Sequence, residues 1–354
     1  MADEKLLMKG AEAISEAAVR VGCKLFFGYP ITPQNEIPEY MSKRLYEIEG
    51  GHFVQAESEV AASNMIYGAA AVGARVMTSS SSPGITLKQE GLSYCAGAEL
   101  PVVVVNIMRG GPGLGGIQPS QSDYFQATRP GHGDFRYIVL APATIQEAAD
   151  LVMEAFDLAD EYRNPVMILG DGLIGQMMEP VVFSAHTPRV FDKSWCTTGC
   201  VGREKNIVNS LYLDPAVLEE HNHHLFRKYA EVERKEVRCE VYRMDDAEYA
   251  IAAYGTTARI AKTAIQRLRA EGLKVGLIRP ITLWPFPYAV FREWGPKIRF
   301  VLDVEMSMGQ MIQDVRIGVG EQVPVHFYGR VGGMVPTPGE IVARIRELAG
   351  QEAA

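Results

Sequence analysis

The stretch LFFGYPITPQN, residues 25–35, decides the fold. Its apolar run Leu25-Phe26-Phe27 ends abruptly in glycine and proline, as a buried strand does where it meets a loop. The preceding segment has apolar side chains at helical spacing, at Ile14, Ala17, Ala18 and Val21. The pattern predicts a helix that leads into a buried strand.

The same alternation continues along the chain. Further strands are expected at 75–78, 101–108, 137–140 and 165–169, and further helices at 59–71, near 87–98 and from Thr144, where Glu147 completes a capping box. Apolar strands separated by helices predict an α/β fold with a mainly parallel sheet and helices on both faces.

The regular pattern stops in a charged stretch and then returns. We expect a first domain at 1–185, a linker or excursion with one exposed helix at 186–245, and a smaller α/β domain at 246–354. Within the last, strands are expected at 249–254, 274–278, 299–304 and 323–328, and helices at 256–270 and 338–348.

Length and composition limit the class of protein. The chain has 354 residues, 47% of them hydrophobic and 22% charged, which is typical of a globular enzyme. Its net charge of −8 and the lack of a long Lys/Arg run disfavour a nucleic-acid partner. The charged start, Met1 to Lys5, and the lack of about 18 consecutive apolar residues predict a cytoplasmic protein without a membrane partner.

The five cysteines include no Cys-x-x-Cys pair. Iron–sulfur clusters and structural zinc sites need about four soft ligands at short spacings, so we expect no metal bound by this chain. The clustered His221, His223 and His224 lie in the charged stretch, where a solvated surface is the simpler interpretation.

Ligands of a parallel sheet bind at the strand ends, so the loops there hold the candidate site residues. Thr32 lies between two prolines that fix the backbone, and its hydroxyl could bond a carboxylate or serve only in a turn. Glu59 opens a helix of small residues, where the helix dipole favours its charge, although most such glutamates are caps or surface charges.

The loop after residues 101–108 reads MRGGPGLGG from Met108. Gly111, Gly113 and Gly116 spell G-x-G-x-x-G, but Pro112 interrupts the place where a dinucleotide-binding helix would open. Arg109 could clamp a carboxylate with its guanidinium, or it could be an ordinary surface arginine.

Gly170-Asp171-Gly172 resembles the opening of the motif that binds Mg²⁺ and the diphosphate of thiamine diphosphate. The asparagine that completes that motif is missing at the expected interval. A metal–diphosphate site is therefore expected on another chain.

Together these loops resemble the alpha subunit of the 2-oxoacid:ferredoxin oxidoreductases, closest to the branched-chain, 2-oxoisovalerate (3-methyl-2-oxobutanoate) type. The resemblance covers nearly the whole chain, and is carried by residues 8–10, 28–40, 55–62, 78–91, 109–116, 120–125 and 165–172. It implies a thiamine-diphosphate pyrimidine-binding domain followed by a domain like the transketolase C-terminal domain.

The resemblance also implies roles for single residues. Glu59 corresponds to the glutamate that hydrogen-bonds N1′ of the aminopyrimidine and favours the imino tautomer, whose nitrogen removes the thiazolium C2 proton. Thr32 and Arg109 correspond to contacts of the substrate carboxylate, and Ile31 to a pocket residue. Pro30, Ser81 and Ser82 are expected to line the cofactor.

Partners follow from the same resemblance. A beta subunit would supply the diphosphate site with Mg²⁺ and a [4Fe–4S] cluster, and gamma and ferredoxin-like delta subunits would complete the complex. Coenzyme A would accept the acyl group, and ferredoxin the electrons.

Three alternatives stay open. A 2-oxoglutarate or aromatic 2-oxoacid enzyme would use much the same loops, although 2-oxoglutarate would call for an extra cation, and none lies within residues 27–42 or 79–85. The chain could also be a non-catalytic scaffold subunit. It could equally be the beta chain of an NAD-linked 2-oxoacid dehydrogenase, with a lipoyl-carrying partner.

Overall fold

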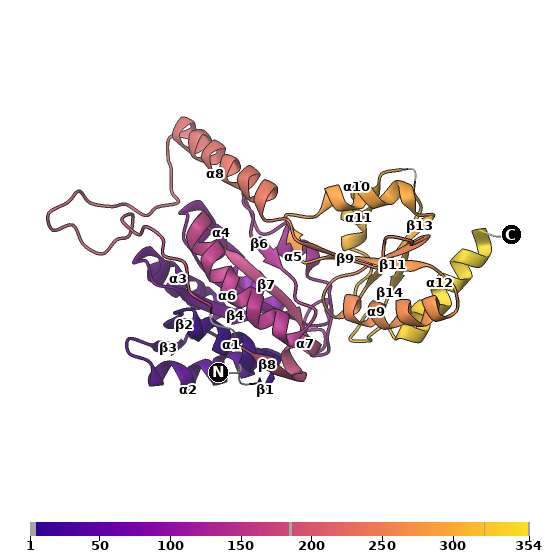
Figure 1. Ribbon diagram of the computed structural model, residues 1–354. Helices are drawn as coiled ribbons and strands as arrows, with labels where there is room; N and C mark the ends of the chain where they lie inside the picture. The colour runs from indigo at the N-terminus through magenta and orange to yellow at the C-terminus, as the bar shows by residue number, and fades with distance from the viewer. Residues whose placement is uncertain (1–4, 184–185, 322, 353–354) are drawn as a thin grey trace.

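A computed structural model describes residues 5–183, 186–321 and 323–352. The charged start at 1–4 and the predicted domain boundary at 185 lie outside these ranges. Figure 1 shows two sheets side by side, with the second built from the C-terminal part of the chain. No helix in the described ranges combines the length and apolar character needed to cross a membrane.

The first sheet has seven strands, in the order β12-β6-β7-β5-β4-β2-β3. All neighbours are parallel except β12, which pairs antiparallel to β6. The strands are β2 (Leu25–Gly28), β3 (His52–Gln55), β4 (Val76–Ser80), β5 (Val103–Met108), β6 (Ile138–Leu140), β7 (Val166–Asp171) and β12 (Thr282–Trp284). The central strands β4, β5 and β7 are buried along their whole length, as strands covered on both faces must be.

Helices cover this sheet. They are α1 (Gly10–Arg20), α2 (Glu36–Arg44), α3 (Glu59–Ala71), α4 (Pro83–Gly97), α5 (Tyr124–Thr128), α6 (Ile145–Tyr162) and α7 (Gly172–Gln176). The connections through α3 and α4 advance along the sheet in the opposite direction to the connection through α6. Because such crossovers are right-handed, the pair α3–α4 and the pair α1–α6 lie on opposite faces.

The second sheet has five strands, in the order β14-β13-β10-β11-β9. They are β9 (Cys239–Tyr242), β10 (Tyr249–Ala252), β11 (Val275–Pro280), β13 (Phe300–Glu305) and β14 (Val325–Gly329), accompanied by α9 (Gly255–Ala270), α10 (Tyr288–Trp294), α11 (Met311–Val319) and α12 (Pro338–Glu352). Only β9 runs antiparallel to its neighbour. The α/β fold with mainly parallel sheets is therefore confirmed.

Three features differ from the expected pattern. β1 (Lys5–Lys9) and β8 (Met178–Val182) form an unexpected antiparallel ribbon. β12 crosses from the C-terminal part of the chain to the first sheet, and β9 extends the second sheet from within the stretch 186–245. That stretch also holds α8 (Pro215–Lys235), a largely exposed helix that stands out at the top of Figure 1.

Candidate functional site

Glu59 lies at the start of α3, next to the carboxyl ends of the strands. Its side chain is only 6% exposed, whereas Glu57, two residues before it, is exposed. The helix begins here because the Ser58 hydroxyl accepts a hydrogen bond from the Ala61 N–H at 3.1 Å. The carboxylate is thus buried in the first helical turn, where the dipole favours its charge.

The first turn of α4 closes tightly on this carboxylate. A Cβ placed on Gly84 would lie 2.8 Å from Oε1 of Glu59 and 2.1 Å from Oγ of Ser80. The buried hydroxyls of Ser80 and Ser81, and that of Thr78 on the same strand, have no hydrogen-bond partner within the described part of the chain. Since buried polar groups are normally paired, the unsatisfied Ser80 hydroxyl beside Glu59 fits a polar ligand such as an aminopyrimidine.

The loop from Gly28 to Asn35 is held rigidly over the sheet by Gln34. This side chain is fully buried, donates to the Tyr29 carbonyl at 3.3 Å, and accepts a hydrogen bond from the Ser79 hydroxyl. It therefore fixes the loop that carries Pro30, which is exposed, and Ile31, which is half-buried.

Thr32 and Arg109 are brought together, but through the main chain of Thr32. Nη1 of Arg109 donates to the Thr32 carbonyl at 2.9 Å, and Nη2 donates to the Leu114 carbonyl at 3.2 Å. The Thr32 hydroxyl accepts from Asn35 at 3.3 Å. Nε of Arg109 is buried without a partner, and no carboxylate lies at ion-pair distance among the described residues. The guanidinium is oriented without an ion pair in the described residues, although its positive charge acts on Asp123, where burial raises the pKa of the carboxyl and this charge opposes the rise. The unpartnered Nε suits an incoming carboxylate.

Ser82 lies at the centre of a buried polar network. Its hydroxyl donates to Oδ2 of Asp123 at 2.6 Å and accepts from the Arg109 N–H at 3.0 Å. Asn106 donates to the same Asp123 oxygen at 3.1 Å and accepts from the Ser82 N–H at 3.2 Å. Burial raises the pKa of Asp123, and the hydrogen bonds from Ser82 and Asn106 oppose the rise.

The backbone of Ser82 is strained, with a φ of +29°. Such conformations cluster at functional sites, where the surroundings must hold them in place. Here the Ser82 network supplies that support. Ser82 thus positions the Arg109 backbone, whereas the neighbouring Ser81 hydroxyl has no partner in the described residues.

A cavity of about 890 Å³ opens between the two sheets beside these residues. Arg109, Ser82 and Asp123 line one side, and Met306 and Met308 line the other. Arg109 is the one cation among the described lining residues. Glu59, Thr32 and Ile31 are not among its lining residues, so of the predicted site residues the cavity reaches Arg109 and Ser82. Thr32 lines a separate cavity of about 490 Å³.

Asp171 serves as a helix cap. Its carboxylate accepts hydrogen bonds from the N–H groups of Leu173 and Ile174, at 2.9 and 3.2 Å, and is almost completely buried. Both contacts satisfy the first turn of α7. The Gly170-Asp171-Gly172 motif therefore has a structural use in this chain.

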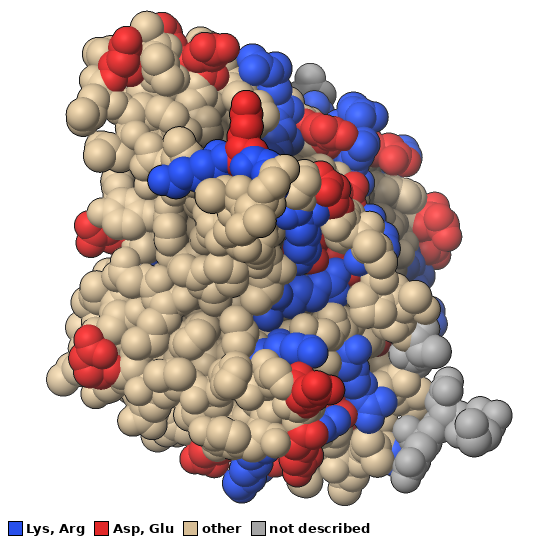
Figure 2. Space-filling view, turned by 90° about the vertical axis from the view of Figure 1, so that its left-hand side faces the viewer, with Lys and Arg blue, Asp and Glu red and all other residues tan. Residues whose placement is uncertain are grey.

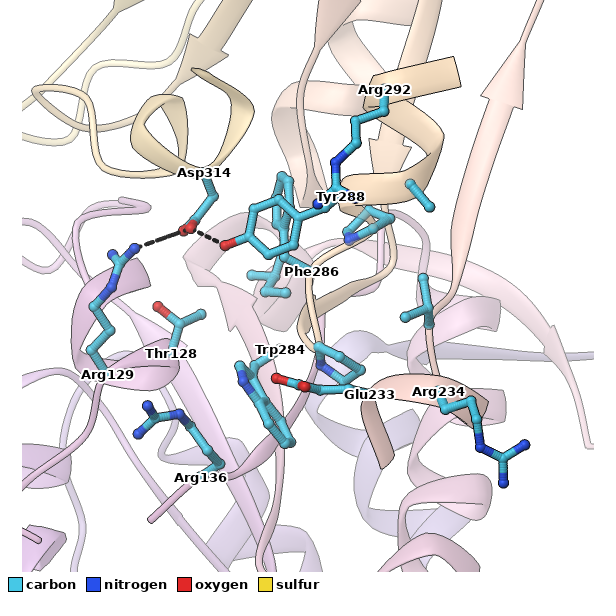
Figure 3. A pocket seen from close by; sticks show the side chains of 15 residues that line it. Thr128, Arg129, Arg136, Glu233, Arg234, Trp284, Phe286, Tyr288, Arg292 and Asp314 are labelled. Atoms are coloured by element: carbon cyan, nitrogen blue, oxygen red, sulfur yellow. Dashed lines mark hydrogen bonds and ion pairs between the residues drawn. The ribbon is translucent and has the colours of Figure 1, made fainter. Parts of the chain in front are cut away.

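A second cavity, of about 670 Å³, lies at the junction of α5, α8, α10 and α11. Figure 3 shows Arg129 and Tyr288 pointing toward Asp314. Nη2 of Arg129 and the Tyr288 hydroxyl donate to Oδ1 of Asp314 at 3.0 and 2.5 Å. None of the site residues predicted from the sequence lines it. Its ion pair joins the two halves of the molecule.

Sequence reasoning did not assign roles to Gln34, Asn106 or Asp123. All three are buried polar residues near strand ends. Their polarity within apolar surroundings was a usable signal, because a buried amide or carboxylate needs partners. Apart from the Tyr29 carbonyl, which lies 5 residues from Gln34, the partners lie 17 to 45 residues away in the chain, which no local pattern reveals.

Two family models match the chain. Residues 16–238 match the thiamine-diphosphate-binding domain of the pyruvate flavodoxin/ferredoxin oxidoreductases, and residues 247–341 match core domain II of pyruvate:ferredoxin oxidoreductase. Together they cover every strand of the two sheets except β9.

Curated relatives match over nearly the full length. A ketoisovalerate oxidoreductase subunit, VorB, of Methanothermobacter marburgensis is 50% identical over 98% of each chain. A 2-oxoglutarate synthase subunit, KorA, of the same organism is 34% identical, over 97% of this chain and 98% of its own.

Solved structures agree. The 2-oxoglutarate:ferredoxin oxidoreductase of Magnetococcus marinus, with 2-oxoglutarate, coenzyme A and succinyl-CoA bound, superimposes with a TM-score of 0.88 at 29% identity. The match covers 98% of this chain and 65% of that longer one. A split-gene transketolase shares the fold at a TM-score of 0.60 and 16% identity, over 96% of this chain and 97% of its own. The chain belongs to the 2-oxoacid:ferredoxin oxidoreductase family.

Proposed function

We propose that this chain is the catalytic alpha subunit of a CoA-acylating oxidoreductase that converts 2-oxoisovalerate to acyl-CoA and CO₂ and passes the electrons to ferredoxin. The observation that carries the proposal is the presence of a buried Glu59 in the first turn of α3 together with an oriented Arg109 whose Nε has no partner in the described residues. The 50% identity to a ketoisovalerate oxidoreductase subunit supports the same conclusion.

Glu59 is proposed as the catalytic carboxylate. Thiamine diphosphate, when bound, supplies the carbon nucleophile that adds to the keto group and allows CO₂ to leave. Glu59 would hold a proton at the pyrimidine N1′ nitrogen, and the Ser81 hydroxyl would face the same ring. The unsatisfied Ser80 hydroxyl beside Glu59 supports this assignment. Ser82 and Pro30 are proposed to shape the cofactor site.

Arg109 and Thr32 are proposed to bind the substrate carboxylate. Nε of Arg109 offers a buried donor, and the bonds from Nη1 and Nη2 to two carbonyls fix the plane of the guanidinium. The Thr32 hydroxyl, which accepts from Asn35, keeps its own proton to donate. Ile31, half-buried in the same loop, is proposed to contact the substrate side chain.

The charge of the cavity favours a branched-chain 2-oxoacid over 2-oxoglutarate. A second carboxylate on the substrate needs a second cation, since an unpaired buried charge is costly. The described lining of the 890 Å³ cavity holds Arg109 as its one cation, with Asp123 close by. Met306 and Met308 offer apolar surface instead.

Partner subunits are proposed to complete the enzyme. Because Asp171 is used as a cap, we assign the diphosphate and Mg²⁺ site to a beta subunit. No group of three or more metal-ligating side chains occurs among the described residues, so the [4Fe–4S] cluster is also assigned to the beta subunit. Gamma and ferredoxin-like delta subunits and coenzyme A follow from the family.

The surface supports contact with other proteins. Figure 2 shows Lys and Arg gathered in a band beside a broad area with few charged side chains. Val190, Val201 and Leu213, in the segment between β8 and α8, are 97%, 103% and 86% exposed. We propose that these apolar side chains contact a partner subunit.

We further propose that residues 1–185 form the cofactor module and residues 246–354 the smaller domain, with 186–245 as a connecting excursion. A cytoplasmic location is proposed with them, and the five free thiols of the chain support a reducing compartment.

The test is to purify the tagged chain anaerobically with the proteins that bind it and to assay CoA-dependent viologen reduction with a panel of 2-oxoacids. We expect the highest kcat/KM with 2-oxoisovalerate. A preference for 2-oxoglutarate or an aromatic 2-oxoacid would overturn the substrate. An intact, cluster-containing complex inactive with every 2-oxoacid would overturn the enzymatic role and favour a scaffold.

A further inference from the structure

Lys88 is a fully buried lysine in the middle of α4, on the face that meets α3. Gly84 precedes it by one turn and Gly91 follows it by almost one. A Cβ on Gly84 would lie 2.8 Å from Oε1 of Glu59, and one on Gly91 would lie 2.3 Å from Oγ of Ser63. The two glycines therefore let α3 and α4 approach closely, and Lys88 is enclosed between these contacts.

The ammonium group of Lys88 is directed at Glu59. Its one hydrogen bond within the described residues goes to the Glu59 main-chain carbonyl, at 3.4 Å. Burial lowers the pKa of Lys88 to about 8, and the negative charge of Glu59 opposes this change. Lys88 thus acts on both the backbone and the charge of the proposed catalytic residue.

Other titratable groups on the two helices do not compensate Lys88. Burial raises the pKa of Cys95 to about 12 and raises that of Tyr67, so both side chains are neutral near pH 7. Glu90 and Tyr94 are exposed and hydrogen-bonded to one another. Glu59 is the one charged group that acts on Lys88 among the described residues.

Lys228 of α8 is a second buried lysine, and its partners indicate a purely structural role. Burial also lowers its pKa to about 8, but its ammonium forms an ion pair with Glu99 at 3.2 Å and a hydrogen bond to the Arg163 carbonyl at 3.1 Å. Lys88 has no ion pair within 4 Å in the described residues. Its burial is therefore not offset by an ion pair, and lysines buried in this way are candidates for a functional role.

We propose that Lys88 is a positioning residue for Glu59: its buried ammonium fixes the first turn of α3 and compensates the buried negative charge of the carboxylate. A buried carboxylate charge is costly unless a cation lies near it. Lys88 supplies that cation from behind the helix, leaving the Glu59 oxygens to the cofactor. The inference rests on the proposed role of Glu59.

The experiment compares four variants of the purified complex: Lys88→Met, Lys228→Met, Glu59→Gln, and the double variant of Glu59→Gln and Lys88→Met. Each is assayed for CoA-dependent viologen reduction with 2-oxoisovalerate from pH 5.5 to 9. We expect Lys88→Met to lower kcat about tenfold at pH 7 and to move the acidic limb of the profile upward by about one pH unit, the equivalent of one lost charge interaction. Lys228→Met should leave the profile in place.

The double variant separates a positioning role from a general loss of structure. If Lys88 acts through Glu59, the double variant should be no slower than Glu59→Gln alone. If the two losses multiply, or if Lys88→Met leaves the acidic limb where it is, the inference is wrong. Should Lys88→Met fail to assemble, Lys88→Gln keeps a donor for the Glu59 carbonyl without the charge and must show the same shift.

The experiment distinguishes a failure of the proposed role of Glu59 from a failure of the proposed role of Lys88. Full activity in Glu59→Gln would overturn the role of Glu59 itself. Low activity in Glu59→Gln together with a wild-type profile in Lys88→Met would overturn only the role of Lys88.

Discussion

Arg109 holds the main-chain oxygen of Thr32 at 2.9 Å, so the loop after β5 is fastened to the loop after β2. These loops are 77 residues apart in the chain and meet because β2, β4 and β5 are adjacent parallel strands whose carboxyl ends share one edge. The sheet therefore sets the relative position of the two residues proposed to bind the substrate carboxylate.

Replacing Arg109 with Lys should raise the KM for 2-oxoisovalerate at least about tenfold. An ammonium keeps the charge but cannot bond both carbonyls and still present a donor in a fixed plane. Steady-state kinetics of the complex measures the effect. Arg129→Lys, which disturbs the ion pair with Asp314 in the other cavity, is the matched control. An equal rise in KM in Arg129→Lys would contradict a substrate-binding role of Arg109.

Gly84→Ala should abolish most activity in a protein that still folds. The added methyl would lie 2.8 Å from the Glu59 carboxylate and must displace it. The readout is the thiamine diphosphate concentration that gives half-maximal activity, which we expect to rise. Gly68→Ala is the control, because it lies on α3 with nothing within 4 Å, and alanine favours a helix by up to about 1 kcal/mol. Wild-type cofactor dependence in Gly84→Ala would contradict the account.

Local sequence patterns predicted the bounds and caps of helices, which depend on neighbouring residues. The predicted bounds of α3 coincide with the helix, from Glu59 to Ala71, because Ser58 provides a cap and small residues follow. The Thr144 cap was also correct, although Glu147 reaches back to the Ala143 N–H, one residue earlier than a standard capping box. By contrast, β12 pairs with β6 more than 140 residues away, and its three residues carry no periodic signal.

In the candidate site, too, some residues could be predicted from local sequence and others could not. Glu59 and Arg109 could be singled out because each follows a strand and carries a charge next to glycine or small residues. The Ser82–Asp123–Asn106 network could not, since it depends on how three separate loops meet. Lys88 was visible only as a polar residue in a helix, and its burial follows from the close contacts at Gly84 and Gly91.

Asp171→Asn should leave the Mg²⁺ dependence of the complex unchanged. Asparagine keeps an oxygen that can accept from the Leu173 and Ile174 N–H groups, so α7 stays capped. Activity is measured during Mg²⁺ titration after chelation. A requirement raised about tenfold or more would place the metal on this chain and contradict its assignment to a partner.

Glu16→Gln should destabilise the chain at neutral pH. Burial opposes ionisation of Glu16, but hydrogen bonds from Arg44, Arg20 and Tyr40 outweigh it and lower its pKa. A lowered pKa means that the stabilisation is present above the unfolded-state pKa and is lost as the pH falls through the folded-state pKa, below about 4.5. Urea unfolding of both proteins should show a difference of about 1–3 kcal/mol at pH 7 that shrinks toward pH 3.5. If the difference in the free energy of unfolding did not change with pH, the ionised form of Glu16 would not be the source of the stabilisation.

The most direct test of the account is the turnover of the complex that carries Glu59→Gln. The exposed neighbour Glu57→Gln serves as control, with anaerobic assembly and cluster content checked for both. We predict that Glu59→Gln assembles and reduces viologen with 2-oxoisovalerate and CoA at least about a hundredfold more slowly than wild type, while Glu57→Gln is unchanged. An assembled Glu59→Gln complex that works at the wild-type rate would contradict the central claim.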